Sequence, residues 1–231
     1  MINIKYLHHW NVTYKEAVDI QQELKQRIII HDKDFPEEIK VIAGADISYS
    51  KKSDLFYAAV ILMEFPAMAI IEEKTIIERA PFPYIPGLLS FREGPALLKI
   101  FETLYHVPDV VIFDGQGIAH PRGIGLASHM GLFLDIPTIG CAKKKLVGRY
   151  DEVGSEAGDY TDLILNEEII GAVLCTKRKV KPLFISSGHK IGIRKSIEII
   201  LLCCKGYKLP EPTRRAHLLV NQIRLKDINS C

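Results

Sequence analysis

The clearest indication of the fold is the segment Val110-Val-Ile-Phe-Asp114-Gly-Gln-Gly-Ile-Ala-His120-Pro-Arg-Gly-Ile-Gly125. It opens with a continuous apolar run, which is typical of a strand buried on both faces of a sheet. The run ends in an acidic residue, and the glycine-rich loop that follows allows the backbone to approach a ligand closely. The glycine spacing is not the GxGxxG pattern of a dinucleotide-binding turn. We therefore expect a central strand with a functional loop at its carboxyl end.

The segments on either side of this strand indicate an α/β fold with a mixed β-sheet. Upstream, three apolar segments separated by turn residues predict an antiparallel meander. Downstream, helical and strand patterns alternate, which predicts helices on both faces of the sheet. The expected strands lie at 41–49, 55–65, 69–79, 137–142, 169–176 and 183–186, with a turn at 51–54, and the expected helices lie at 12–30, 90–105, 126–134, 192–204 and 214–225. We expect one domain over residues 1–231.

Composition allows a nucleic-acid partner without requiring one. The formal net charge is only +2, so binding of an anionic polymer would depend on local charge. The number of cysteines is odd, at 5, and no CxxC pair occurs, which argues against a disulfide framework and a zinc site and favours a reducing compartment. No signal peptide is evident, and no apolar run reaches the roughly 20 residues that span a bilayer. We expect a cytoplasmic monomer with no membrane contact.

Three acidic side chains are candidates for a metal site. Asp46 interrupts an apolar strand, Asp114 ends another, and Glu93 lies in the first turn of an expected helix. Each has a simpler explanation: a buried hydrogen bond for Asp46, turn chemistry for Asp114, and for Glu93 a capping box with Ser90 as the N-cap. If the three converge at one sheet edge, they form the oxygen-rich site that Mg²⁺ prefers and that phosphodiester cleavage uses.

Histidine and lysine near these acids are further candidates. His120 lies in the glycine-rich loop, and Lys143 follows an expected strand as the first residue of a lysine run. A lone loop histidine is often structural, and a lysine run is often a solvated surface. The alternative is phosphate contact, which a second basic cluster at 177–181 could also provide.

A proline-rich loop precedes the helix that carries Glu93. It reads Pro81-Phe-Pro83-Tyr84-Ile85-Pro86-Gly87. Prolines stiffen a loop, and a stiff loop tipped with Tyr and Ile could be a wedge between bases. The alternative is a rigid connector with Tyr84 packed onto the core.

These residues resemble a known family, the endonuclease V family. The resemblance is specific in two long motifs, 83–93 (PYIPGLLSFRE) and 114–129 (DGQGIAHPRGIGLASH). Shorter similar segments are Gly44-Ala-Asp46, Gly140-Cys-Ala-Lys143, Gly188-His-Lys and 206–214. The match covers roughly residues 40–218. It departs at Ser187, where the family is expected to have proline, and it is loose over 154–162, which leaves the roles of His189 and of that loop open.

The resemblance implies a ribonuclease H-like fold and a DNA repair reaction. The implied reaction is hydrolysis of the second phosphodiester bond 3′ to a deoxyinosine, which leaves 3′-hydroxyl and 5′-phosphate ends and retains the lesion. The implied cofactor is Mg²⁺, with Mn²⁺ as a substitute, and the implied partner is inosine-containing DNA or RNA. The implied site residues are Asp46, Glu93 and Asp114 for the metal, His120 and Lys143 beside it, Pro83, Tyr84, Ile85 and Pro86 for the wedge, and Gly87, Gly115, Gly117 and Gly125 for the hypoxanthine pocket.

Three alternatives stand beside this hypothesis. An inosine-specific ribonuclease would share every implied residue. Another ribonuclease H-like nuclease, such as a junction resolvase or a transposase core, would share the acids but would have no use for the wedge. A non-catalytic nucleic-acid-binding module would not need Asp46 and Asp114.

Overall fold

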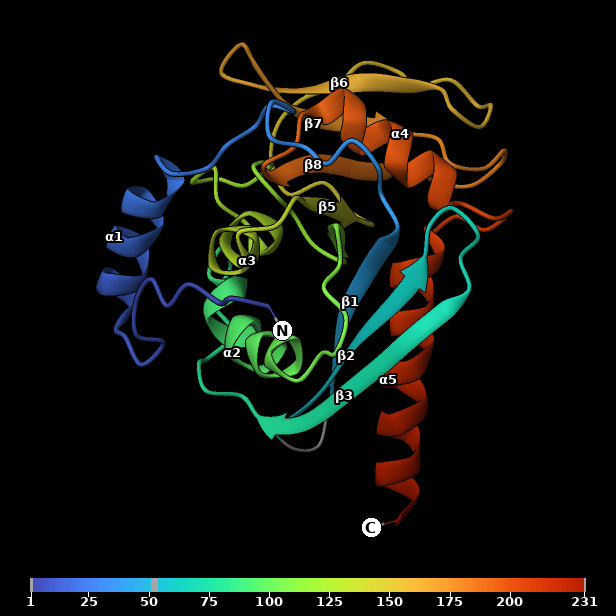
Figure 1. Ribbon diagram of the computed structural model, residues 1–231. Coiled ribbons are helices and arrows are strands. Elements are labelled where there is room, and N and C mark those ends of the chain that lie inside the picture. The colour runs from blue at the N-terminus through green and yellow to red at the C-terminus, as the bar shows by residue number, and fades with distance from the viewer. Residues whose placement is uncertain (1, 51–53, 231) are drawn as a thin grey trace.

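An eight-stranded mixed sheet forms the centre of the protein (Figure 1). The computed structural model describes residues 2–50 and 54–230. The strand order is β3-β2-β1-β4-β5-β8-β7-β6, in which β1, β4 and β5 are parallel neighbours and every other pair is antiparallel. The strands are β1 (Val41–Tyr49), β2 (Leu55–Glu64), β3 (Ile70–Arg79), β4 (Val110–Phe113), β5 (Thr138–Ala142), β6 (Tyr160–Leu165), β7 (Glu168–Leu174) and β8 (Leu183–His189). The expected meander and mixed sheet are confirmed.

Helices cover both faces of this sheet, as predicted. Helices α2 and α3 lie on one face and α4 and α5 on the other, while α1 packs outside α2 and α3 (Figure 1). The helices are α1 (Tyr14–Lys25), α2 (Leu89–Glu102), α3 (Leu126–Leu134), α4 (Ile193–Cys203) and α5 (Glu211–Ser230). Among the described residues, no helix is long and apolar enough to cross a membrane.

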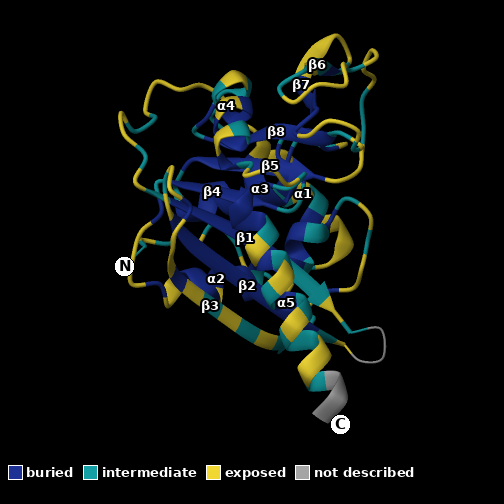
Figure 2. Cartoon of the chain, turned by 90° about the vertical axis from the view of Figure 1, so that its right-hand side faces the viewer, coloured by how far each residue is buried: buried dark blue, intermediate teal, exposed yellow. Residues whose placement is uncertain are grey.

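Strand β1 separates two hydrophobic cores because its side chains alternate between the faces of the sheet. Ile42 belongs to the core beneath α4 and α5, whereas Ala43 and Ala45 belong to the core beneath α2 and α3. The same alternation directs Asp46 toward the α5 face. Figure 2 shows that the central strands are largely buried and that β3, at the sheet edge, alternates mainly between exposed and half-buried positions.

Helix α5 approaches β1 closely because Gly44 has no side chain. A Cβ atom at Gly44 would lie 2.1 Å from the carbonyl carbon of Pro212. From there the strand advances about 6.8 Å to Asp46, and the helix advances about 7.5 Å from Pro212 to His217. The two advances match, so His217 lies above Asp46, and two residues further along Ser48 Oγ donates to Asn221 Oδ1 at 3.4 Å.

Two expectations about secondary structure were incomplete. Strand β6 was not among the expected strands, because its short, half-exposed pattern lacks the apolar alternation that marks a strand. Helix α5 begins at Glu211 and continues past Leu225; Glu211 accepts from Arg214 through both carboxylate oxygens, which supports the first turn. The turn expected at 51–54 falls mostly outside the described residues.

Candidate active site

The two predicted aspartates lie side by side at the centre of the sheet. Ala45 on β1 pairs with Phe113 on β4, and these two strands are parallel neighbours. Asp46 directly follows Ala45, and Asp114 directly follows Phe113. The backbone N–H of Asp114 donates to the carbonyl of Ala45 at 3.2 Å, which fixes this register. The sequence analysis placed Asp46 within one strand and Asp114 at the end of another, and the parallel pairing brings them together.

His217 is a third member of this group, and the sequence analysis missed it. Its Nδ1 lies 2.7 Å from Oδ2 of Asp46, and ligand atoms of Asp46, Asp114 and His217 all lie within 4.8 Å of one another. Asn221, one helical turn later, donates to the backbone carbonyl of His217 at 2.8 Å and lies 3.2 Å from its Nε2. No local motif marks His217, because only the packing of α5 on β1 brings it to the aspartates.

Lys143, which the sequence analysis placed beside the metal site, contacts Asp114. Its Nζ donates to Oδ2 of Asp114 from the chain just after β5. Burial lowers the pKa of Lys143, but the negative charges of Asp114 and Asp46 outweigh burial, and the net shift is upward. Lys143 therefore stays protonated and places a positive charge beside the two aspartates.

Glu93 faces the aspartates from α2 and is not part of a helix cap. The N-cap of α2 is Leu88, which makes no side-chain cap, and the Ser90 hydroxyl is bound to His129 Nδ1 at 2.8 Å, so the expected capping box is wrong. Burial, then the charges of Asp46 and Asp114, raises the pKa of Glu93 to about 8. The hydroxyl of Tyr49 donates to Oε1 of Glu93 at 3.4 Å.

We define the carboxylate cluster as Asp46, Glu93, Asp114 and His217. The members whose ligand atoms lie within 4.8 Å of one another, close enough to share a divalent cation, are Asp46, Asp114 and His217, and Glu93 acts on the aspartates through its charge. Burial, followed by repulsion from Asp46, also raises the pKa of Asp114 despite the opposing charge of Lys143. The raised pKa values of Glu93 and Asp114 show that negative charge is disfavoured here without a counter-ion, and a bound cation would favour the ionised carboxylates. Carboxylate oxygens with a single imidazole are ligands that Mg²⁺ or Mn²⁺ accepts.

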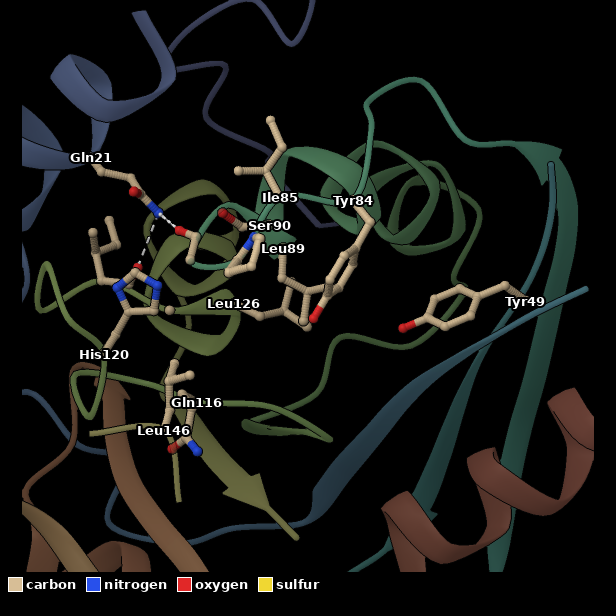
Figure 3. A pocket seen from close by; sticks show the side chains of 14 residues that line it. Gln21, Tyr49, Tyr84, Ile85, Leu89, Ser90, Gln116, His120, Leu126 and Leu146 are labelled. Carbon is tan, nitrogen blue, oxygen red and sulfur yellow. Dashed lines mark hydrogen bonds between the residues drawn. The ribbon is translucent and has the colours of Figure 1, made fainter. Parts of the chain in front are cut away.

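A separate pocket of about 210 Å³ lies beside the cluster. It is smaller than the roughly 300–1,000 Å³ typical of sites for drug-sized ligands, so it suits a single planar ring system. The proline-rich loop forms one wall and the glycine-rich loop the other, and Tyr49 lies at the edge of the pocket beyond Tyr84 (Figure 3). The lining residues include Gln21, Tyr49, Tyr84, Ile85, Pro86, Gly87, Ser90, Gln116, His120, Ile124, Gly125, Leu126 and Leu146.

The expected wedge is exposed at the mouth of this pocket. Tyr84 is 66% exposed, so the alternative in which it packs on the core is wrong. Pro83 and Pro86 are also exposed, and Ile85 is half-buried. Leu146, on the lysine-rich loop after β5, is 48% exposed and lines the same pocket, a feature that the sequence analysis did not single out.

The four expected pocket glycines separate into two pairs. Gly87 and Gly125 line the pocket, whereas Gly115 and Gly117 are not among the lining residues. Gly117 is packed against β8: its N–H donates to Ser186 Oγ at 2.8 Å, and a Cβ there would lie 2.1 Å from the Ser187 carbonyl oxygen. Its N–H is therefore not available to a ligand.

His120 lines the pocket and lies apart from the carboxylate cluster. Its Nδ1 accepts the backbone N–H of Arg122 at 3.2 Å. Burial, followed by the charge of Arg122 and partly offset by a hydrogen bond with the Gly87 backbone, lowers the pKa of His120 to about 4. The ring is therefore neutral at neutral pH, which suits contact with an uncharged base better than contact with a phosphate.

His189 has a structural setting outside both sites. Its Nδ1 accepts the backbone N–H of Ile29 at 3.3 Å, which ties the N-terminal region to the end of β8. Burial, followed by the charge of Lys190, lowers the pKa of His189 to about 4. The basic cluster at 177–181 is an exposed turn between β7 and β8, where Arg178 pairs with Glu156 at 3.0 Å.

Paired aspartates on parallel strands of a mixed sheet, with a glutamate and a lysine beside them, define the class of metal-dependent phosphodiester hydrolases. A model of the Endonuclease V family matches residues 22–218, and the chain belongs to this family. It is 47% identical over 222 residues to the endonuclease V of Dehalococcoides mccartyi, which covers 96% of this chain and 99% of the relative. It is 42% identical over 221 residues to that of Gloeobacter violaceus, covering 94% and 89%.

Solved structures agree with this assignment. The endonuclease V structure from Bacillus subtilis matches with a TM-score of 0.93 and 30% identity, covering 100% of both chains. The Ciona intestinalis enzyme, in complex with a 23mer DNA containing an inosine followed by a ribo-adenosine, matches with a TM-score of 0.84 and 30% identity, covering 94% of this chain and 100% of that one. The expected α/β fold and the family resemblance are confirmed.

Proposed function

We propose that this protein hydrolyses the second phosphodiester bond 3′ to a deoxyinosine in DNA, leaving 3′-hydroxyl and 5′-phosphate ends and retaining the lesion. The observation that carries the proposal is the pairing of two adjacent but distinct sites: an acidic cluster suited to a cation and a neutral pocket the size of one ring system. The inosine-containing DNA bound by the Ciona relative supports the same substrate class.

The acidic residues have separate tasks in this proposal. Asp46, Asp114 and Glu93 would hold Mg²⁺, or Mn²⁺ as a substitute, which when bound would supply a Lewis acid and an activated water for phosphodiester hydrolysis. His217 orients Asp46 through its Nδ1 contact. Lys143 orients Asp114 and offers a positive charge to the phosphate. No residue of this cluster needs to touch the damaged base.

The separation of the two sites explains why the base is retained. Tyr49 lines the pocket and also donates to Glu93, so the pocket and the cluster share a wall but not a volume. An extruded base in the pocket therefore lies beside the metal-binding residues, and the bond that reaches them belongs to the backbone at a fixed offset. Most enzymes that act on an extruded base change the base itself.

The wedge acts before the chemistry. Pro83 and Pro86 restrict the loop, and the exposed ring of Tyr84 stands at the pocket mouth. An aromatic side chain inserted into a stack separates neighbouring bases and exposes one of them to extrusion. All of these residues come from one chain, which supports a monomer as the active unit.

A cleavage assay on matched strands tests the proposal. DNA and RNA strands of one sequence, each with a single inosine or adenosine, are incubated with Mg²⁺, Mn²⁺ or EDTA, and the product ends are mapped on a labelled strand. We expect one cut at the second phosphodiester 3′ to inosine in DNA and no cut in EDTA. A released free base, a cut 5′ to the lesion or equal cutting of the adenosine strand would refute the proposal, and preferential cutting of a four-way junction would support the resolvase alternative.

A further inference from the structure

A network of hydrogen-bonded side chains connects the N-terminal segment to the wall of the pocket. Ser90, in the first turn of α2, lines the pocket and is 2% exposed (Figure 3). Its Oγ lies 2.8 Å from Nδ1 of His129 on α3, and Nε2 of His129 lies 2.8 Å from Nε2 of His8. Nδ1 of His8 lies 2.9 Å from the backbone carbonyl of His9. The network therefore begins outside the residues matched by the family model, which start at 22.

The His9 carbonyl fixes the position of every hydrogen in this network. A carbonyl oxygen can only accept, so Nδ1 of His8 carries the hydrogen between them. A neutral imidazole has one N–H group, so Nε2 of His8 is an acceptor and Nε2 of His129 is the donor. Nδ1 of His129 then has no hydrogen, and the Ser90 hydroxyl donates to it.

Both imidazole rings are neutral, as this assignment requires. Burial, followed by the charges of His8 and His120, lowers the pKa of His129 well below its usual value of 6.5. Burial also lowers the pKa of His8. The rings of Trp10, Phe91 and Phe133 pack around the two imidazoles, with ring centroids 4.5 to 5.6 Å apart. These apolar surroundings disfavour a proton on either histidine, so the order of donors and acceptors is stable at neutral pH.

Ser90 therefore offers the pocket an acceptor and no donor. Its one hydrogen is used on His129, and within residues 2–50 and 54–230 no other group is hydrogen-bonded to its Oγ, so a lone pair remains for a ligand. Hypoxanthine in a nucleic acid has a single N–H group, at N1, because its N9 is bonded to the sugar. An acceptor on the pocket wall can therefore form an N–H hydrogen bond with this base only at N1.

We propose that Ser90 is a specificity-determining residue that accepts a hydrogen bond from N1–H of hypoxanthine, and that His129 and His8 are positioning residues that hold its hydroxyl in this polarity. The inference rests on the proposed function, because it assigns the pocket to a purine. The network takes no part in the carboxylate cluster, so its loss should affect binding of the base more than the chemical step.

The test compares three bases at one position of an otherwise all-thymidine strand: hypoxanthine, unsubstituted purine and 1-deazapurine. Purine has a lone pair at N1, whereas 1-deazapurine has a C–H group there, and neither has a substituent at C6. The ratio of their affinities therefore reports whether the protein presents a donor or an acceptor to N1. Each unlabelled strand competes with cleavage of a labelled inosine strand by the full-length protein in Mg²⁺.

Two variants change the network at opposite ends. Ser90→Ala removes the acceptor, and His8→Phe keeps an aromatic ring but removes the partner of His129 Nε2. The matched controls are Ser128→Ala, at a fully buried hydroxyl next to His129 that does not line the pocket, and His9→Phe, which is exposed and keeps its backbone carbonyl.

In the wild type and in both controls, we expect the 1-deazapurine strand to inhibit about fivefold more strongly than the purine strand, because the N1 lone pair of purine is left unsatisfied against an acceptor. Ser90→Ala should make the two strands equal and should raise KM for the inosine strand more than it lowers kcat. In His8→Phe, His129 moves its hydrogen to Nδ1, and the Ser90 hydrogen is released toward the pocket. The order of the two strands should therefore reverse, which a structural defect alone does not produce.

Nitrogen NMR of protein labelled in its histidine rings tests the network without any substrate. We expect the hydrogen of His129 on Nε2 in the wild type and on Nδ1 in His8→Phe. The Nδ1–H tautomer in the wild type, or a wild-type ratio of the two strands in folded Ser90→Ala, overturns the inference, and thermal unfolding identifies a variant that fails to fold.

A second acceptor on the pocket wall provides a further check. Oε1 of Gln116 has no hydrogen-bond partner, although Nε2 of the same amide donates to the Lys144 carbonyl at 3.0 Å. If Gln116→Met, rather than Ser90→Ala, equalises the purine and 1-deazapurine strands, the inference is overturned in favour of Gln116. A wild-type protein that cuts inosine and adenosine strands equally overturns the proposed function instead, whatever the tautomer of His129, so the two failures are distinguishable.

Discussion

The carboxylate cluster and the pocket share Tyr49 as a wall, yet they are built in opposite ways. The cluster draws its residues from regular elements, β1, α2, α5 and the end of β4, whose relative positions are fixed by sheet register and helix packing. The pocket draws most of its residues from two loops, which side-chain hydrogen bonds from α1 and Arg122 hold together. The residues of the metal site thus lie on helices and strands, which hold them rigidly. Most of the residues that line the pocket lie on loops, whose sequence can change without altering the metal site.

The two sites also differ in charge. Burial and like charges raise the pKa of both Glu93 and Asp114, so the cluster favours a bound cation. Burial lowers the pKa of His120 to about 4, so the pocket stays uncharged at neutral pH. A neutral pocket does not attract phosphate, which keeps the polyanionic backbone at the cluster and the base in the pocket.

Neutralising the cluster should give the largest effect and should leave the pocket unaffected. We expect Asp46→Asn and Asp114→Asn each to lower kcat by about 10²–10³-fold or more, because metal stabilisation of the transition state is worth several kcal/mol. Binding of an inosine strand, measured by fluorescence anisotropy, should change far less. Asp19→Asn, on the exposed side of α1, is the control. Substantial cleavage by either folded variant, or cleavage in excess EDTA, would contradict a metal site here.

Removing His217 should weaken the cluster without abolishing it. We expect His217→Ala to reduce kcat by about 10–100-fold and to raise the cation concentration needed for half-maximal activity, as is usual when a group that supports a metal site is lost. Asn221→Ala should do the same to a smaller extent, since Asn221 acts through His217. His9→Ala, which is exposed, is the control. An unchanged cation requirement in His217→Ala would remove this histidine from the site.

His217 also marks the limit of what the sequence predicts. The apolar runs were sufficient to predict β1 and β4, and the acids within or after them suggested that Asp46 and Asp114 could converge, but the parallel pairing that brings them together is seen only in the structure. The position of α5 depends on Gly44, whose missing Cβ admits the Pro212 backbone. That contact joins residues far apart in the chain, and no local pattern encodes it.

The pocket shows the same limit for another reason. The two loop motifs identified Gly87 and Gly125, but local spacing could not show that Gly117 packs against β8 rather than lining the pocket. Gln21 was missed because a buried glutamine in an amphipathic helix has no sequence signature until its partners are known. Likewise, the capping-box spacing of Ser90 and Glu93 was misleading because tertiary contacts with His129 and with the cluster outweigh local capping.

Truncating the Tyr84 side chain of the wedge should have a smaller effect on cleavage, and the size of the effect should depend on whether the substrate is duplex or single-stranded. We expect Tyr84→Ala to lower kcat/KM on duplex DNA about tenfold, because stacking of an aromatic ring on a base is worth about 1–3 kcal/mol. Single-stranded substrate needs no strand separation and should lose little. Tyr14→Ala, at a similarly exposed tyrosine on α1, is the control. Equal losses on duplex and single strand would mean that Tyr84 supports the pocket rather than opening the helix.

The smallest effect should be on the stability of the fold at acidic pH, and it should distinguish His120, which lines the pocket, from His189, which lies outside it. The pKa values of His120 and His189 are both about 4 in the folded protein, below the usual value of 6.5. The unfolded chain therefore binds protons that the folded chain does not as the pH falls below about 6.5, so stability should decrease between about pH 6.5 and pH 4 and level off below that range. A shift of one pKa unit corresponds to about 1.4 kcal/mol, so each histidine should lower the free energy of unfolding by about 2 kcal/mol at pH 5 relative to pH 8.

We expect His120→Gln and His189→Gln each to flatten the dependence of the unfolding free energy on pH, measured by urea titration. Only His120→Gln should also weaken binding of an inosine strand, because His189 lies outside the pocket. A pH dependence as steep as that of the wild type in both variants would show that these rings are not held neutral by burial.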